Sequence, residues 1–241
     1  MHRHSATAAV LAGTLLFAAP LKAAADREAS ASLGIAVNSG NTESERYDLT
    51  LDYRERTERH RFTGNLEFAR GKDSDGDEDV NNSRVGGAYD FFFDGPWYAN
   101  TNASWRQDRM ADLRQRYLVG VGAGYQFFDD ERTRLSVEFG PTYISEQTLE
   151  ARERSREGAV RWALDFRQYI LDGAVRFFHR HELISELDDS DAWFITTRSG
   201  LRMPLMENLS ASLQFNYDYE NQTSADHRYD ATTLVNLTYD W

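Results

Sequence analysis

The sequence predicts an all-β fold, an antiparallel transmembrane β-barrel of about 12 strands. Three observations predict it. Apolar and polar residues alternate along many short segments, the connections between them alternate between short and long, and the mean hydropathy is -0.64. Alternation with a period of two places one row of side chains on each face of a strand. A polar average is compatible with a barrel, because only every second residue faces lipid.

Residues 1–25 have the pattern of a secretory signal peptide. A short cationic start precedes an apolar run at 6–19, and the small residues Ala23, Ala24 and Ala25 follow. The run is shorter than the roughly 20 apolar residues with which a helix spans a bilayer. We therefore expect cleavage after Ala25, leaving residues 26–241 as the barrel.

The clearest strand covers residues 46–54, where four apolar residues alternate with five polar ones. Segments of the same kind fill the rest of the chain, each near the roughly 9 to 11 residues with which a tilted strand crosses a membrane. Later segments cover 174–180, 193–203, 209–219 and 229–241. The outward rows of the others are, in order, Leu33, Ile35 and Val37; Phe62, Leu66 and Phe68; Val85, Gly87, Tyr89 and Phe91; Trp97 to Trp105; Tyr117 to Phe127; Leu135, Val137, Phe139 and Tyr143; and Val160, Trp162, Leu164 and Phe166.

Large aromatic residues lie near the ends of these segments, and small or aliphatic residues lie between them. This distribution is typical of two aromatic girdles at the membrane interfaces, with an apolar band between them.

The connections fall into two sets that alternate along the chain. A soluble β-sandwich gives no reason for such sorting. In a barrel with both termini in the periplasm, the short turns lie on the periplasmic side of the membrane and the long loops on the extracellular side. The short set is 56–59, 93–96, 129–132, 171–173 and 204–208, and the long set is 71–82, 107–113, 146–156, 183–190 and 221–227.

The last strand carries an apolar row from Tyr229 to Trp241. In a barrel this strand must close the sheet, and we expect the barrel-assembly machinery to recognise its aromatic end. Membrane lipid is then the surrounding partner. The pattern leaves the oligomeric state open.

Composition excludes several classes of function. The formal net charge is -12 and there is no cysteine. Disulfides, thiolate chemistry and cysteine-based zinc sites are therefore excluded. Nucleic acid is not expected as a partner, because phosphate binding requires a basic patch.

A short motif near the start of the barrel carries a family resemblance. Ser32, Leu33 and Gly34 precede the stretch 39–44, Ser-Gly-Asn-Thr-Glu-Ser, and the alternating strand follows. This arrangement resembles the YdiY-like salt-induced outer membrane protein family, numbered 481 among domains of unknown function. The resemblance implies a barrel in the outer membrane of a Gram-negative bacterium and supplies no catalytic residue. Physically, Gly40 and Asn41 form a tight-turn pair.

The inward face is predicted to carry a ladder of charges of both signs. Charges in a narrow lumen must be paired or hydrated, so the ladder forms either a self-paired plug or a polar pore. An excess of arginine favours anions in a pore, and the acidic outer loops oppose this. The ladder comprises Arg46, Asp48, Asp52, Arg54, Arg61, Glu67, Arg84, Arg106, Arg116, Arg134, Glu138, Arg161, Asp165 and Arg167, and the same face continues with Asp90, Arg176, Arg180, Arg198, Arg202, Asp218 and Asp230.

Acidic residues alternate in one outer loop, at Asp73, Asp75, Asp77 and Asp79. Oxygens spaced in this way can converge on a hard cation such as Ca²⁺, although the spacing departs from an EF-hand loop. A solvated loop is the ordinary interpretation of such a run. We expect no other cofactor.

His179 and His181 raise the alternative of a hydrolase acting on lipid or peptide. No nucleophile elbow or protease motif accompanies them, and His179 continues the lipid-facing row of its segment. We expect no enzymatic activity. The function that fits best is a passive one, a narrow pore or an envelope-structural barrel, with a link to salt or osmotic conditions taken from the family name. A barrel hydrolase and a soluble periplasmic β-sandwich are the alternatives.

Overall fold

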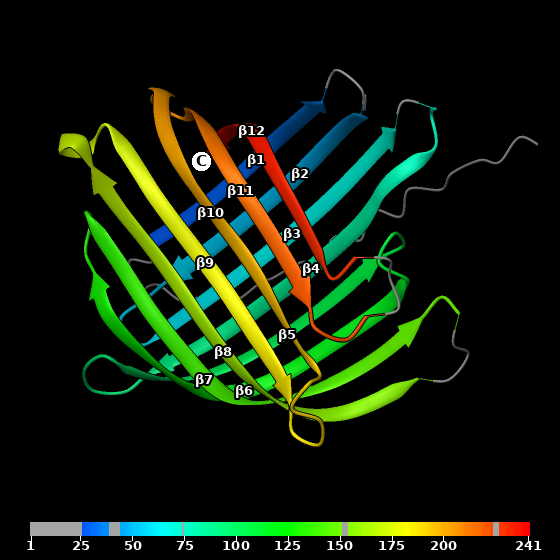
Figure 1. Ribbon diagram of the computed structural model, residues 1–241. Coiled ribbons are helices and arrows are strands. Elements are labelled where there is room, and N and C mark those ends of the chain that lie inside the picture. Colours follow the sequence, from blue (N-terminus) through cyan, green and yellow to red (C-terminus); the bar gives the residue numbers. More distant parts are fainter. Residues whose placement is uncertain (1–25, 39–43, 74, 151–153, 224–226) are drawn as a thin grey trace, which may run out of the picture.

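The computed structural model describes residues 26–38, 44–73, 75–150, 154–223 and 227–241. The predicted signal peptide and the Gly40–Asn41 turn lie outside these residues. In the described part, twelve antiparallel strands form one closed barrel (Figure 1). The strands are β1 (Asp26–Asn38), β2 (Ser44–Arg56), β3 (His60–Asp73), β4 (Glu78–Phe92), β5 (Trp97–Asp108), β6 (Leu113–Asp129), β7 (Thr133–Thr148), β8 (Ser155–Ile170), β9 (Val175–Glu186), β10 (Trp193–Met206), β11 (Leu209–Glu220) and β12 (Tyr229–Asp240), with a 3₁₀ turn at Leu171–Gly173.

The sheet closes where β1 pairs with β12. Leu33 lies opposite Leu237, and Ala29 and Trp241 exchange backbone hydrogen bonds of 3.3 and 3.1 Å. Every described strand therefore has a neighbouring strand on both sides, and the described sheet has no edge strand. This closure confirms the predicted barrel and excludes the soluble sandwich, whose two sheets would keep open edges.

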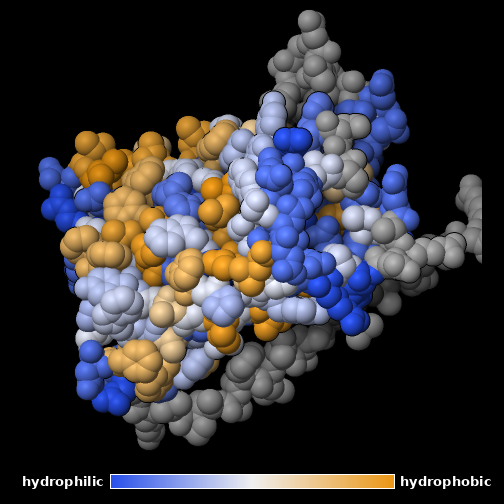
Figure 2. Space-filling model, turned by 60° about the horizontal axis from the view of Figure 1, so that its bottom comes forward, coloured by the Kyte–Doolittle hydropathy of each residue, from blue (hydrophilic) through white to orange (hydrophobic). Residues whose placement is uncertain are grey.

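The outer wall is apolar. Leu33, Val119 and Val235 are 62%, 54% and 62% exposed, which would be unfavourable for a contiguous surface in water. Figure 2 shows hydrophobic side chains gathered over the wall, a large hydrophilic area toward the right of the view and smaller hydrophilic groups along the left edge. Such a wall is suited to lipid, so the barrel is of the transmembrane type.

Aromatic rings pack together near both ends of the wall. Tyr125 lies 4.9 Å from Trp97 between ring centroids, and Trp193 stacks on Tyr219 at 5.0 Å. These clusters occupy the positions that interfacial girdles require. Among the described residues, no helix has the length and apolarity needed to cross a bilayer.

The strands are longer than predicted, with 12 residues in β5 and 17 in β6. The expected loop 71–82 shrinks accordingly, because β3 continues to Asp73 and β4 begins at Glu78. Backbone pairing extends beyond the apolar band, for example between Gly71 and Val80. The apolar alternation marks only the lipid-facing part of each strand, so the prediction of length was wrong. We call the rim with the longer connections the loop end and the opposite rim the turn end.

Two glycines bring β6 and β7 close together. A Cβ atom on Gly140 would lie 2.2 Å from the carbonyl oxygen of Val121, and one on Gly122 would lie 2.5 Å from that of Phe139. Both contacts are with backbone, which has little freedom to move. The close approach of β6 and β7 at this point therefore depends on the absence of side chains.

We predict that Gly140→Ala lowers the free energy of unfolding by about 1–3 kcal/mol, the usual cost of forcing an extra methyl group into a packed site. The measurement is the urea or temperature dependence of the folded band in unheated gel electrophoresis. Gly64→Ala is the matched control, because its Cβ would approach no heavy atom closer than 4.0 Å. Equal losses in both variants would contradict the proposed backbone collision.

Candidate functional site

All residues of the predicted ladder of charges lie in the barrel interior. It encloses a central cavity of about 370 Å³ and a smaller one toward the loop end. Arg116 lies in the same interior, against carboxylates of β7 and β11. The central cavity is lined by Asp52, Arg54, Arg61, Glu67, Arg84, Arg134, Glu138, Arg161, Asp165 and Arg167, and the smaller one by Arg46, Asp48 and Arg106 together with Glu67 and Arg84.

In the loop-end half of the lumen, one carboxylate forms ion pairs with three arginines. Asp218 on β11 accepts a hydrogen bond from Arg198 at 2.6 Å and lies 3.2 and 3.9 Å from the guanidinium nitrogens of Arg106 and Arg84. Arg198 also reaches Glu67 on β3 at 3.4 Å. Strands β4 and β5 lie across the ring from β10 and β11. These ion pairs therefore span the lumen instead of following one wall.

Arg116 joins β6 to β11 across the lumen nearer the loop rim. Its guanidinium donates to Glu146 on the neighbouring strand and to Glu220 on β11, the latter at 2.5 Å. The same group lies 4.3 Å from the centre of the Phe194 ring. Only 4% of Arg116 is exposed. Next to it, four inward apolar residues pack together with Phe194 and narrow this half further; they are Leu118, Ile144, Ala159 and Ile184.

A second group of ion pairs joins side chains of β3, β4, β7, β8 and β9. Arg61 donates to Asp90 at 2.5 Å and lies 3.9 Å from Glu138. Glu138 also accepts from Arg161 at 2.8 Å, and Arg161 donates to Glu182 as well. Each charge in this group faces at least one of opposite sign, as burial requires.

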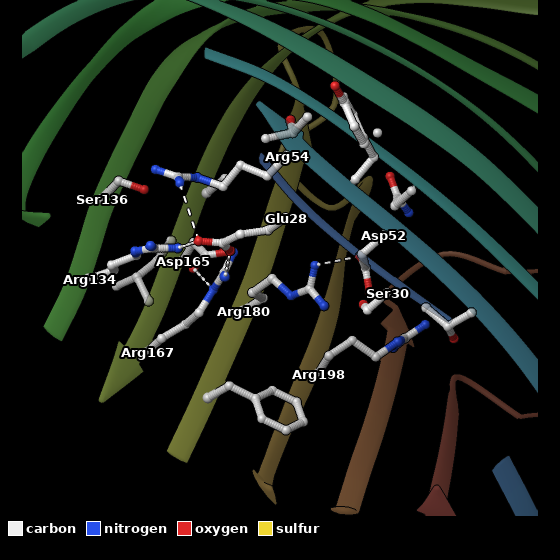
Figure 3. Close-up of a pocket in the computed structure, with 18 of the residues that line it drawn as sticks. Glu28, Ser30, Asp52, Arg54, Arg134, Ser136, Asp165, Arg167, Arg180 and Arg198 are labelled. Carbon is white, nitrogen blue, oxygen red and sulfur yellow. Dashed lines mark hydrogen bonds and ion pairs between the residues drawn. The ribbon is translucent and has the colours of Figure 1, made fainter. Parts of the chain in front are cut away.

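Toward the turn end, Glu28 joins opposite walls of the barrel. Its carboxylate on β1 accepts from Arg134 on β7 at 2.5 Å and from Arg167 on β8 at 3.3 Å. Nearby, Arg180 on β9 reaches Asp52 on β2 at 3.4 Å. Figure 3 shows these side chains converging from both sides of the cavity. The lumen is thus crossed by ion pairs at several levels.

Several partners were missing from the predicted ladder. Glu28, Asp129 and Glu182 line the cavity, and Glu146 and Glu220 hold Arg116. All five lie toward strand ends, beyond the apolar alternation that defined the predicted segments. If the alternating pattern of each strand had been continued by a few residues, these five carboxylates would have been included in the predicted ladder.

The acidic loop has a local structural role. One carboxylate oxygen of Asp73 accepts the backbone N–H groups of Asp75 and Asp77, at 3.0 and 2.9 Å. Such bonds fix a turn without a metal ion. Across the described ranges, no three acidic or histidine side chains gather as metal ligands. Calcium binding at 73–79 stays a prediction.

The two histidines face outward and belong to one hydrogen-bonded chain. Trp162 Nε1 lies 3.0 Å from His181 Nε2, His181 Nδ1 lies 3.0 Å from His179 Nε2, and His179 Nδ1 lies 2.7 Å from Ser199 Oγ. Leu164 and Leu201, at neighbouring positions of the sheet, are apolar. A polar chain is thus set into the lipid-facing wall.

The direction of this chain follows from the indole, which can only donate. His181 Nε2 must accept, so the proton of that neutral ring is on Nδ1 and is donated to His179 Nε2. His179 in turn carries its proton on Nδ1 and donates it to Ser199. A general base would have to accept from the serine hydroxyl instead. The arrangement therefore satisfies polar groups in an apolar wall and does not activate Ser199.

We predict that both imidazoles are in the Nδ1–H form at neutral pH. Nitrogen chemical shifts of selectively labelled histidine in the detergent-solubilised barrel measure this directly. Ser199→Ala keeps the tryptophan donor, so it should leave both tautomers unchanged. An Nε2–H form at His179 would contradict the assigned direction and would fit a base beside a nucleophile.

The fold and its interior together define a class: a closed transmembrane β-barrel with an apolar outer wall and a lumen crossed by ion pairs. The chain belongs to the family described as "Protein of unknown function, DUF481", whose model matches residues 31–241.

No protein of curated function matches the sequence. Among solved structures, the chain is similar to the NanC porin, with 14% identity, coverage of 89% of this chain and 98% of that one, and a TM-score of 0.48. The translocator domain of the autotransporter NalP from Neisseria meningitidis has 13% identity, coverage of 89% and 87%, and a TM-score of 0.45. The β-domain of the Bordetella autotransporter BrkA has 14% identity, coverage of 91% and 99%, and a TM-score of 0.41.

Proposed function

We propose that this protein is an outer-membrane barrel that forms a narrow pore for small ions, closed at rest by ion pairs across its lumen. The observation that carries the proposal is the position of these pairs. Asp218 joins β11 to arginines of β4 and β5 on the far side of the ring, and a cavity lined by polar side chains lies beyond them toward the turn end. Opening requires only that side chains separate, while the backbone ladder stays intact.

The balance of charge gives the pore its preference. The central cavity is lined by ten arginines and nine carboxylates. An excess of fixed positive charge in a narrow, low-dielectric passage favours anions. The preference is weak in the paired state, because nine of the ten arginines have a carboxylate partner, and it grows when a carboxylate is removed.

The placement in the outer membrane is part of the proposal. The apolar wall supports a bilayer environment, and the longer connections at one rim match the usual external loops of such barrels. The predicted secretion signal at residues 1–25 and the predicted assembly signal at the last strand are consistent with this placement. Both remain expectations.

A link to salt conditions follows from the same ion pairs. Dissolved ions weaken attraction between charges, but partly buried pairs are screened less than exposed ones. Arg198 and Asp218 are 13% and 19% exposed. We therefore expect conductance to rise faster than bulk conductivity only in concentrated salt, on the order of 1 M, where the screening length is about 3 Å.

We predict that Asp218→Asn increases single-channel conductance several-fold and makes it more anion-selective, because three arginines then lose their shared carboxylate. Planar-bilayer recordings with a salt gradient measure both quantities. Asp94→Asn is the matched control, since that side chain is fully exposed at a turn. A heat-modifiable gel band verifies that each variant is folded.

Two results would overturn the proposal. Absence of channels in both the native protein and folded Asp218→Asn would support an envelope-structural barrel. Hydrolysis of lipid or peptide that is lost in His179→Ala would support the enzyme alternative.

A further inference from the structure

We propose that Arg176 is the centre of a binding site inside the lumen for a small, singly charged oxyanion that carries hydroxyl groups, such as a sugar acid. The site would lie within the central cavity, on the wall formed by β8, β9 and β10. This inference rests on the proposed function, because the ligand enters through the same lumen.

Arg176 differs from the other arginines of the cavity. Each of the other nine has a carboxylate within 4.0 Å. Arg176 has no ion pair with any described residue. Its Nε is also buried without a hydrogen-bond acceptor, as are Nη1 of Arg54 and Nε of Arg198, but those two guanidinium groups have carboxylate partners. A buried guanidinium donor without a partner is costly. Arg176 is thus the one arginine of the cavity lining that has no carboxylate partner among the described residues.

The neighbours of Arg176 make this location more electropositive. Arg202 lies directly opposite it on β10, and like charges facing each other across two strands repel. Arg202 is itself engaged, with Asp240 and Ser210 each at 2.5 Å. On the other side, Tyr169 is the register partner and provides no charge. An anion bound to Arg176 would relieve the repulsion without displacing an existing pair.

The adjoining wall is suited to hydroxyl groups. Ser30, Ser212, Gln214 and Thr238 on β1, β11 and β12 line the same cavity, and Ser212 and Thr238 are only 6% and 2% exposed. Hydroxyl and amide groups both donate and accept, so they match the hydroxyls of a ligand in either role. Phe178, two residues from Arg176, adds an apolar ring to the lining.

These features select the class of ligand. The cavity of about 370 Å³ is within the range that holds a small organic molecule. Chloride would leave the hydroxyl-rich wall unused, and a polyanion would exceed the one uncompensated charge. A carboxylate or monoanionic phosphate ester on a hydroxylated carbon chain fits both walls, because the guanidinium can bind its oxygens in a bidentate manner.

The test uses gluconate as the probe and glucose as its uncharged counterpart. Isothermal titration of the folded, detergent-solubilised barrel should show saturable binding of gluconate and none of glucose. Arg176→Gln should weaken gluconate binding about tenfold or more, the effect of losing a charge-assisted hydrogen bond. Arg27→Gln is the control, because Arg27 is 63% exposed and pairs with Glu55 near the turn-end rim.

Three results would overturn the site: no gluconate binding to the native barrel, equal binding of glucose, or unchanged affinity in folded Arg176→Gln. Conductance separates this inference from the proposed pore. Channels without gluconate binding would refute only the site. Gluconate binding with no channels under any salt condition would refute the pore and leave the site, as a ligand-holding cavity of a closed barrel.

Discussion

The pairing of β1 with β12 is the constraint on which the rest of the structure depends. A bilayer offers no hydrogen bonds to backbone groups, so a spanning sheet must leave none unpaired. Closing the ring satisfies this requirement and separates two environments that differ sharply. The side chains of each strand then alternate between lipid and a narrow interior. Leu33 and Leu237 meet on the outside of the closing pair, and Ser32 meets Thr238 on the inside with a hydroxyl contact of 2.8 Å.

The interior follows from this closure. A ring of twelve strands brings opposite walls within reach of two long side chains, so an arginine on one strand can find a carboxylate far away in the chain. Arg134 and Glu28 are an example. Pairs of this kind stabilise the barrel only while both partners are present. The contacts that support the barrel are therefore the same ones that cross its lumen.

Alternation, together with the sorting of short and long connections, was sufficient to predict the barrel, the approximate number of strands and the inward position of the charges, because burial between lipid and lumen has a strict period of two. It could not predict strand ends, since pairing continues where both faces are polar, as between Glu45 and Lys72 and between Ser44 and Asp73. Nor could it predict partners across the lumen. Which carboxylate meets Arg116 depends on strand stagger and side-chain reach, and these are properties of the closed ring and not of any segment.

The hydrogen-bonded chain in the outer wall has a fixed direction. In the chain of Trp162, His181, His179 and Ser199, each imidazole has a donor on one side and an acceptor on the other. Reversing either ring would place two donors or two acceptors face to face, so the rings can reverse only together. The indole, which has a single proton and no lone pair to offer, removes that second arrangement. One tryptophan thus fixes the dipole direction of a group extending over three strands, β8, β9 and β10.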